Sequence, residues 1–189
     1  MRYISSQLDL IKNNVELINN KNIIYEIHKI SLYAVRILKK NRKIIFCGNG
    51  GSAADSNHLS AELVGRFLKK RKALNAISLS ANTSAITAIS NDFGYSEVFA
   101  RQIEGNCARG DLLFLITTSG KSLNILKAFK MAQTIGVKTV LLSSILAKNL
   151  RFKSDFKILV PASRTDRIQE LHIIIGHLIC EQIERLILK

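Results

Sequence analysis

Short apolar runs alternate with longer segments of helical periodicity from residue 43 to the end of the 189-residue chain. The apolar runs have the character of buried strands and span residues 43–47, 74–79, 112–117, 137–142 and 156–160. The segments between and after them with helical spacing cover about 53–68, 82–91, 122–135 and 166–187. Such an alternation is typical of a parallel sheet with helices on both faces. It predicts one α/β domain.

Residues 4–40 precede this alternation and show a helical pattern of their own. Apolar side chains recur at three- and four-residue steps, as in Leu8, Ile11 and Val15 and again in Ile23 and Ile27. A helical hairpin is therefore predicted. We expect residues 1–189 to form a single domain in which 1–40 is an extension used in oligomerisation, because a sheet already covered on both faces leaves this apolar surface without a partner.

Composition removes several classes of protein. Hydrophobic residues make up 47% of the chain, which argues against general disorder. No apolar run approaches the roughly 20 residues that span a bilayer, and the N-terminus lacks the pattern of a signal peptide, so a cytoplasmic protein with no membrane partner is expected. The net charge of +14 suggests nucleic acid, but the densest basic cluster, residues 69–72, is short and has no interleaved aromatic residues. No nucleic-acid partner is expected.

A glycine-rich loop, Gly48-Asn49-Gly50-Gly51-Ser52, follows the first predicted strand and precedes a helix. Glycines allow the backbone to approach an anion closely, and the helix directs N–H groups and its positive dipole end toward it. The loop lacks the GKS or GKT of a Walker motif and the full GxGxxG pattern. Ligands of open parallel sheets bind beyond the carboxyl ends of the strands, where this loop is expected. A tight turn without a ligand is the structural alternative.

A hydroxyl-rich loop follows the third predicted strand. Thr117, Thr118, Ser119 and Ser122 supply four hydroxyls within six residues, immediately before a helix. Helix capping accounts for one hydroxyl but not for four. Hydroxyls and free backbone N–H groups together suit a phosphate, and a phosphorylated small molecule is favoured over a nucleotide, whose base would need a larger apolar slot.

Titratable side chains lie on helices that are otherwise suited to burial. His58 and Glu62 are spaced i, i+4 and share one helix face, while the last helix carries Gln169 and His177 among apolar residues. Such groups are costly in a core unless they are paired or used. They predict either a metal site, an acid/base site or a hydrogen-bonded pair, and the residues alone do not decide among these.

These segments together resemble the sugar isomerase (SIS) domain proteins, and specifically the sedoheptulose 7-phosphate isomerases. The matching stretches are 47–55, 58–67, 91–95, 117–122 and 167–172, with His177 beyond them. The resemblance implies a flavodoxin-like three-layer sandwich with a five-stranded parallel sheet, and a homotetramer with sites at subunit interfaces. It also implies conversion of sedoheptulose 7-phosphate to D-glycero-D-manno-heptose 7-phosphate, an aldose-ketose isomerisation in bacterial heptose biosynthesis for lipopolysaccharide or other surface glycans.

The resemblance also implies roles for individual residues. Zinc would be held by His58, Glu62, Gln169 and His177, and Glu62 and His177 would be catalytic. Substrate contacts are expected from Asn49, Gly50, Gly51, Ser52, Glu62, Asn91, Asp92, Thr117, Thr118, Ser119, Ser122, Asp166 and Gln169. Proton transfer between C1 and C2 through a cis-enediol needs a base and a nearby acid. Glu62 is the expected base and His177 its partner, although the roles could be exchanged, and His177 of one chain is expected to approach Glu62 of another.

A non-catalytic protein of the same fold is the alternative. It would resemble the bacterial replication-initiator-associating protein, which forms a tetramer and binds a partner protein. Such a protein can keep the fold and the glycine-rich loop while losing its acid/base residues. Because Glu62 and His177 are both present, the isomerase interpretation is preferred.

Overall fold

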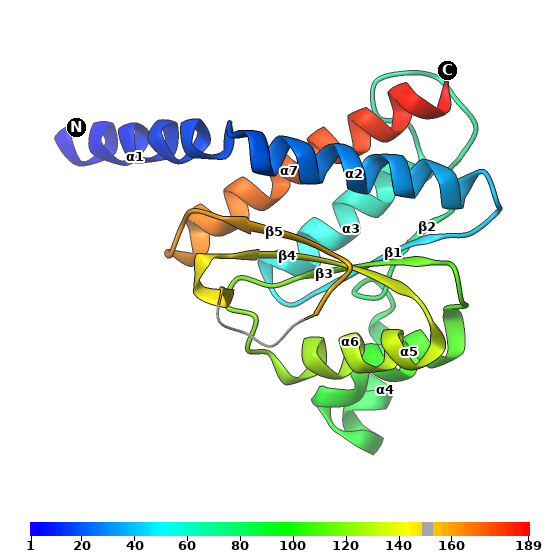
Figure 1. Ribbon diagram of the computed structural model, residues 1–189. Coiled ribbons are helices and arrows are strands. Elements are labelled where there is room, and N and C mark those ends of the chain that lie inside the picture. The colour runs from blue at the N-terminus through cyan, green and yellow to red at the C-terminus, as the bar shows by residue number, and fades with distance from the viewer. Residues whose placement is uncertain (149–152) are drawn as a thin grey trace.

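The structure is a computed structural model that describes residues 1–148 and 153–189. Five strands form one sheet in the order β2-β1-β3-β4-β5, and each neighbouring pair is parallel. The strands are β1 (Ile44–Gly48), β2 (Ala76–Ser78), β3 (Leu112–Ile116), β4 (Lys138–Ser144) and β5 (Phe156–Val160). The predicted flavodoxin-like sheet is confirmed (Figure 1).

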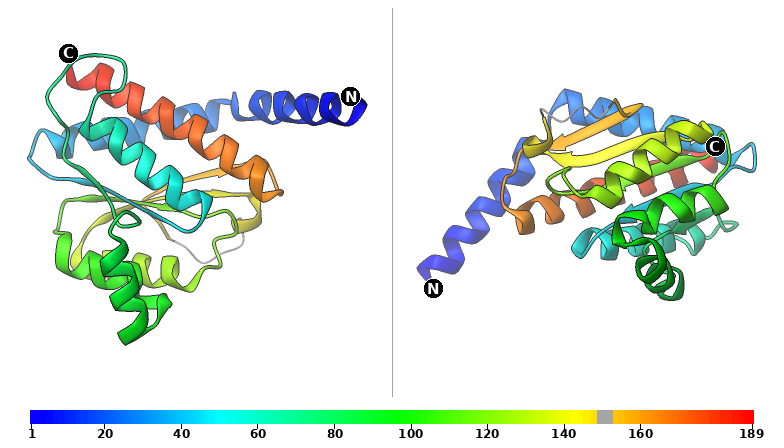
Figure 2. Two further views of the ribbon diagram at one scale, coloured as in Figure 1. Left: turned by 180° about the vertical axis from the view of Figure 1, so that it is seen from behind. Right: turned by 90° about the horizontal axis from the view of Figure 1, so that it is seen from below.

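Helices cover both faces of this sheet, so the domain has three layers: helices, sheet and helices (Figures 1 and 2). One face is covered by α2 (Lys21–Leu38), α3 (Gly51–Val64) and α7 (Thr165–Ile187). The opposite face is covered by α4 (Thr83–Phe93), α5 (Val98–Asn106) and α6 (Leu123–Ile135). Two short 3-10 turns, Tyr95–Glu97 and Ile145–Ala147, complete the described elements after α4 and β4.

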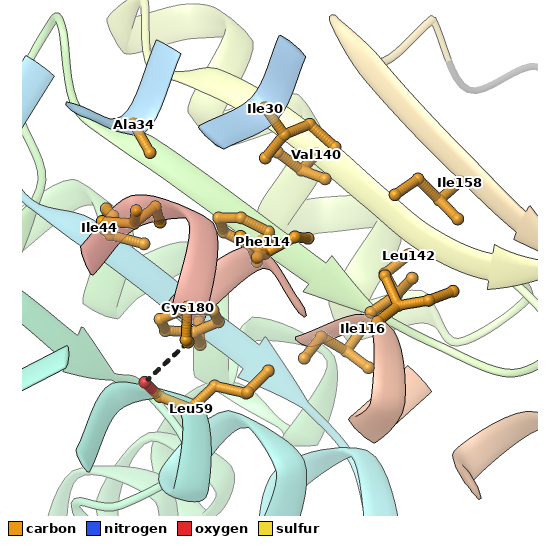
Figure 3. Packing of buried hydrophobic residues seen from close by; sticks show 14 of the residues in the cluster. Ile30, Ala34, Ile44, Leu59, Phe114, Ile116, Val140, Leu142, Ile158 and Cys180 are labelled. Carbon is orange, nitrogen blue, oxygen red and sulfur yellow. Dashed lines mark hydrogen bonds between the residues drawn. The ribbon is translucent and has the colours of Figure 1, made fainter. Parts of the chain in front are cut away.

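Successive side chains along each strand point to opposite faces of the sheet, and they form two separate hydrophobic cores. In β1, Ile44 and Phe46 point to the face covered by α3 and α7, whereas Ile45 and Cys47 point to the face covered by α5 and α6. All five residues of β1 are buried, as expected for a central parallel strand. Figure 3 shows the first core, in which residues from β1, β3, β4 and β5 meet α2, α3 and α7.

The strand order places the two predicted binding loops side by side. After β1, the chain forms β2 on one side of this strand and then β3 on the other side. The direction in which successive strands are added to the sheet therefore reverses between β1 and β3. Gly48 at the end of β1 is in register with Ile116 at the end of β3. Ligands of such sheets bind at this boundary. The glycine-rich loop and the hydroxyl-rich loop therefore open onto one place.

Both predicted N-terminal helices are present, as α1 (Arg2–Ile18) and α2. Asn20 begins α2 by accepting a hydrogen bond from the Ile23 backbone N–H at 3.0 Å. Helix α1 extends beyond α2 and projects away from the sheet (Figure 2). Its side chains Tyr3, Ile4 and Leu8 are more than 60% exposed.

Several boundaries differ from those predicted. The second strand spans Ala76–Ser78 instead of 74–79, and α3 ends at Val64 instead of near residue 68 because the chain leaves the helix after Gly65. Helix α5 was not predicted at all. None of the described helices combines the length and apolar character that crossing a bilayer requires.

Candidate active site

The glycine-rich loop connects β1 to α3 and depends on its glycines for two different reasons. Gly50 precedes α3 with φ +55°, a conformation that side chains disfavour. A Cβ on Gly48 would lie 2.5 Å from the Ser52 carbonyl oxygen, so the backbone can fold back here only without a side chain. A Cβ on Gly51 would lie 2.4 Å from Gln169 Nε2. The absence of a side chain at Gly51 therefore lets the Gln169 side chain of α7 lie against the start of α3.

Asn49 joins this loop to the neighbouring strand-end loop. Its Nδ2 donates to Asn124 Oδ1 at 2.9 Å, and its Oδ1 accepts from Asn124 Nδ2 and from the Tyr95 hydroxyl, both at 2.8 Å. Asn124 is buried on α6 and Tyr95 follows α4. With both lone pairs of Oδ1 engaged, Asn49 has one Nδ2 hydrogen left to offer to a ligand.

A cleft of about 230 Å³ opens between the two strand-end loops and the start of α7. It is lined by Asn49, Gly50, Gly51, Ser52, Ile116, Thr117, Thr118, Ser122, Thr165 and Gln169. Eight of these residues were expected to bind substrate. The sequence did not single out Ile116 or Thr165, because a strand residue and the first residue of a helix carry no distinguishing pattern.

Some hydroxyls of the hydroxyl-rich loop bind the backbone of the loop itself, whereas another is left to bind a ligand. Thr117 is buried, and its Oγ1 accepts from the Gly120 N–H at 3.2 Å. Ser119 Oγ accepts from the Lys121 N–H at 3.3 Å and is not part of the cleft lining. Ser122 stands at the N-cap of α6, yet its side chain makes no capping hydrogen bond. Ser122 is part of the cleft lining, so we expect its hydroxyl to be within reach of a ligand there.

A second group of polar side chains lies farther along α3. His58 Nε2 is 2.8 Å from His177 Nε2 and 3.4 Å from Glu62 Oε1. At the shorter distance one imidazole must donate and the other accept. Ligand atoms of all three residues lie within 4.8 Å of one another, an arrangement that could hold a metal ion. We call these three residues the His/Glu cluster.

Close packing of α3 against α7 brings the His/Glu cluster together. A Cβ on Gly176 would lie 2.6 Å from the Leu59 side chain, so the two helices approach each other where α7 has no side chain. Cys180 Sγ lies 4.0 Å from the Leu59 carbonyl oxygen one turn farther on (Figure 3). Because His58 and His177 are the immediate neighbours of this contact, their rings are directed at each other.

Gln169 does not join the His/Glu cluster within this chain. It lies eight residues before His177 on α7, about 12 Å along the helix axis, and its amide rests against Gly51. His177 lies close to Glu62 of its own chain, because α3 packs beside α7. An approach of His177 to Glu62 of another chain stays a prediction.

Three further residues expected at the substrate lie outside the cleft lining. Asn91 and Asp92 are exposed at the end of α4 and hydrogen-bond to each other at 2.8 Å. Asp166, in the first turn of α7, pairs with Arg164 and Arg167. Its hydrogen bond from Arg164 holds the pKa of this carboxyl well below its ordinary value. Asp166 is therefore ionised and engaged with protein partners.

Two further titratable groups, the partly buried Asp55 and the buried His172, lie near these sites. Burial raises the pKa of Asp55, one turn before His58, to about 6 against the opposing effect of His58, and its Oδ2 has no hydrogen-bond partner among the described residues. Burial lowers the pKa of His172 to about 4. His172 is therefore neutral and can donate to the Ser143 carbonyl oxygen at 3.2 Å, which ties α7 to the end of β4.

The sequence of this chain is similar to those of known proteins. The SIS domain family matches residues 8–144. A phosphoheptose isomerase of Nitratiruptor sp. is 49% identical over 160 residues, covering 85% of this chain and 86% of the relative. One of Akkermansia muciniphila is 45% identical over 183 residues, covering 97% and 96%. The chain belongs to the phosphoheptose isomerase family.

Solved structures of family members share the fold over nearly the whole chain. The phosphoheptose isomerase of Neisseria gonorrhoeae superimposes with a TM-score of 0.87 at 32% identity, covering 97% of this chain and 98% of that one. The phosphoheptose isomerase of Francisella tularensis gives a TM-score of 0.89 at 31% identity, with 97% of each chain covered. The predicted membership of a sugar isomerase family is thereby confirmed.

Proposed function

We propose that this member of the phosphoheptose isomerase family interconverts sedoheptulose 7-phosphate and D-glycero-D-manno-heptose 7-phosphate, an early step toward heptose-containing surface glycans. The observation that carries the proposal is the pairing of two sites on α3. Ser52 at its start lines the hydroxyl-rich cleft, and His58 in the His/Glu cluster lies six residues on, about 9 Å along the axis. A sugar phosphate could place its phosphate at one end and its reacting carbons at the other.

The cleft would hold the phosphate. Ser122 and Thr118 offer hydroxyls, and the free N–H groups at the start of α6 add donors and a positive dipole end. Ser144 Oγ donates to the Thr118 carbonyl oxygen at 2.8 Å and so fixes the loop from behind. The loop is thus held in shape before the ligand arrives, which lowers the cost of ordering it on binding.

The His/Glu cluster would move the protons. Glu62 is partly buried, with 22% of its side chain exposed, and Oε1 is the oxygen nearer His58. We propose that Oε2 is the basic atom, which takes the proton from one of the carbons C1 and C2 and returns it to the other. His177 would donate to and accept from the carbonyl or ring oxygen, and the reverse assignment of the two roles remains an alternative.

The donor set of the His/Glu cluster fits zinc, because two imidazole nitrogens and a carboxylate oxygen are common zinc ligands. His58, Glu62 and His177 would hold the ion. When bound, it would act as a Lewis acid that polarises the substrate carbonyl. For Gln169, expected as a fourth ligand, we propose a contact with substrate instead, because it lines the cleft and is not part of the His/Glu cluster.

A partner-binding protein without catalysis is the less favoured function. It would have no need for a His/Glu cluster beside a hydroxyl-lined cleft, and the relatives reported above are phosphoheptose isomerases. A coupled assay with purified protein and sedoheptulose 7-phosphate separates the two functions. Turnover supports the isomerase, whereas a folded protein that binds the sugar phosphate without turnover supports the alternative.

Ser122→Ala is expected to raise KM for the sugar phosphate about tenfold or more and to change kcat little. The reason is that a lost hydrogen bond to a charged group is worth about 1.5–3 kcal/mol. Thr134→Ala, an exposed hydroxyl farther along α6, is the matched control. Steady-state kinetics of both variants provides the test. An unchanged KM for Ser122→Ala would mean that the loop only begins the helix.

We further propose that the chain is cytoplasmic and forms a homotetramer, with neither nucleic acid nor membrane as partner. The proposal places residues 1–40 as the oligomerisation extension of a single domain. Exposed apolar side chains support it: Ile4 and Leu8 on α1, and Ile24 and Leu32 on α2, are each at least 47% exposed. Light scattering at micromolar concentration should give four times the chain mass of 21.1 kDa. A single chain mass would contradict it.

A further inference from the structure

Two charged side chains are buried together outside the cleft and the His/Glu cluster. Arg71 precedes β2, Glu184 is near the end of α7, and each side chain is 2% exposed. Arg71 Nε donates to Glu184 Oε2 at 2.9 Å. A buried ion pair carries a large desolvation cost, and apolar residues of similar volume often stabilise a protein as well or better. The charge pairing alone is therefore weak evidence for a gain in stability, and the groups that the two side chains bind are more informative.

Glu184 holds the segment that follows α3. Its carboxylate accepts from the backbone N–H groups of Phe67, Leu68 and Lys69 at 3.2, 2.9 and 2.7 Å. Burial alone would raise the pKa of Glu184, but these three N–H groups and Arg71 hold it below its ordinary value. The carboxylate is thus charged and fully engaged.

Arg71 holds the end of α3 itself. Its Nη2 donates to the Glu62 carbonyl oxygen at 2.8 Å, and its Nη1 donates to the carbonyl oxygens of Leu63, Gly65 and Lys72 at 2.8, 3.3 and 3.1 Å. The last carbonyl groups of a helix have no partner within the helix, and a cation there also suits the helix dipole. Arg71 therefore fixes the last turn of α3.

The segments that Arg71 and Glu184 bind are both connected to the His/Glu cluster. Glu62 belongs to the turn whose carbonyl groups Arg71 binds. Phe67, whose N–H is bound by Glu184, packs its ring against His177 with 5.6 Å between centroids. Glu184 lies seven residues after His177 on the same helix. The ion pair thus joins the segment carrying Glu62 to the helix carrying His177.

We propose that Arg71 and Glu184 are positioning residues, which hold the end of α3 against α7 so that Glu62 and His58 face His177. Neither side chain touches the cleft lining or belongs to the His/Glu cluster. The proposal rests on the function proposed for that cluster. It predicts that catalysis depends on the ion pair even in variants that still fold.

The test compares a single and a double variant. Glu184→Gln removes the charge, and Arg71→Met with Glu184→Leu replaces the pair by apolar side chains that can fill the same space. We expect both variants to fold, the double variant with a lower melting temperature because the backbone groups that the pair binds lose their partners. Assayed well below their melting temperatures, both should lose kcat, the double variant at least tenfold. KM should stay within about threefold, because the cleft lies at the other end of α3. Wild-type kcat in the folded double variant would overturn the proposal.

A control removes a more exposed ion pair. Lys138→Met with Asp155→Leu deletes a pair at the start of β4, at the end of the strands opposite the cleft. The wild-type kcat is expected in this variant. An equal loss of kcat in both double variants would show a general effect of removing ion pairs and would overturn the proposal.

A second measurement does not depend on activity. In isotope-labelled protein without substrate, a nuclear Overhauser contact between the Phe67 and His177 rings is expected in the wild type and absent in the double variant. A retained contact would reject the positioning role. A wild-type protein that shows the contact but no turnover would reject the proposed isomerase function while leaving the structural role of the pair intact.

Discussion

Glu62→Gln is expected to lower kcat at least a hundredfold and to leave the melting temperature close to that of the wild type. Acid/base catalysis contributes about 10²–10⁴-fold, and glutamine fills the same space without accepting a proton. The same result is expected for His177→Gln. Steady-state kinetics with sedoheptulose 7-phosphate, together with thermal unfolding of each variant, provides the measurement.

The control for this prediction lies on the same helix. Among the described residues, the Ser60 side chain bonds only locally, through its Oγ to the Asn57 carbonyl oxygen at 2.9 Å. Ser60→Ala should therefore retain wild-type kcat. If Glu62→Gln or His177→Gln kept more than about a tenth of wild-type activity, that residue would be removed from the chemistry.

Gly48→Ala is expected to destabilise the protein by about 1–3 kcal/mol or more and to abolish turnover. The added Cβ would lie 2.5 Å from the Ser52 carbonyl oxygen and 2.7 Å from the Ser52 carbonyl carbon. These are backbone atoms at the start of α3, so relief requires movement of the helix that carries both proposed sites. Chemical denaturation and kinetics of the variant test the expectation.

A second glycine supplies the control. Gly105 lies within α5, and a Cβ there would have no atom of the described residues within 4 Å beyond its own helix turn and chain neighbours. Gly105→Ala should therefore keep full activity and gain about 0.5–1 kcal/mol, because alanine is the better helix former. Comparable losses in both variants would show that the close approach at Gly48 is not what the loop requires.

The sequence predicted the sheet and the location of the cleft because both follow from local patterns. Buried parallel strands are continuous apolar runs, and their carboxyl ends lie at one end of the sheet, so the loops after the first and third runs were expected at that end. That the two loops are neighbours follows from the strand order of the structure. The pairing of His58 with Glu62 followed equally from i, i+4 spacing on one helix. Each of these inferences needs only neighbours in the sequence and a rule of sheet topology.

The missed features depend on distant contacts. Residues 69–72 resemble a solvated basic cluster, yet Arg71 is buried because Glu184 lies beside it, 113 residues farther along the chain. Asn49 is held by Asn124, 75 residues away. Gln169 and His177 share a helix, but only the contacts with Gly51 and His58 show that they serve different ends of α3. No local period records such pairings.

The most direct test follows the reaction in D2O by proton NMR, with purified protein and sedoheptulose 7-phosphate. Isomerisation through an enediol exchanges a proton with solvent, so the account predicts D-glycero-D-manno-heptose 7-phosphate with deuterium at C2. Glu62→Gln should give neither product nor exchange. Folded wild-type protein, supplied with zinc, that left the ketose unchanged would contradict the central claim that the cleft and the His/Glu cluster on α3 form one isomerase site.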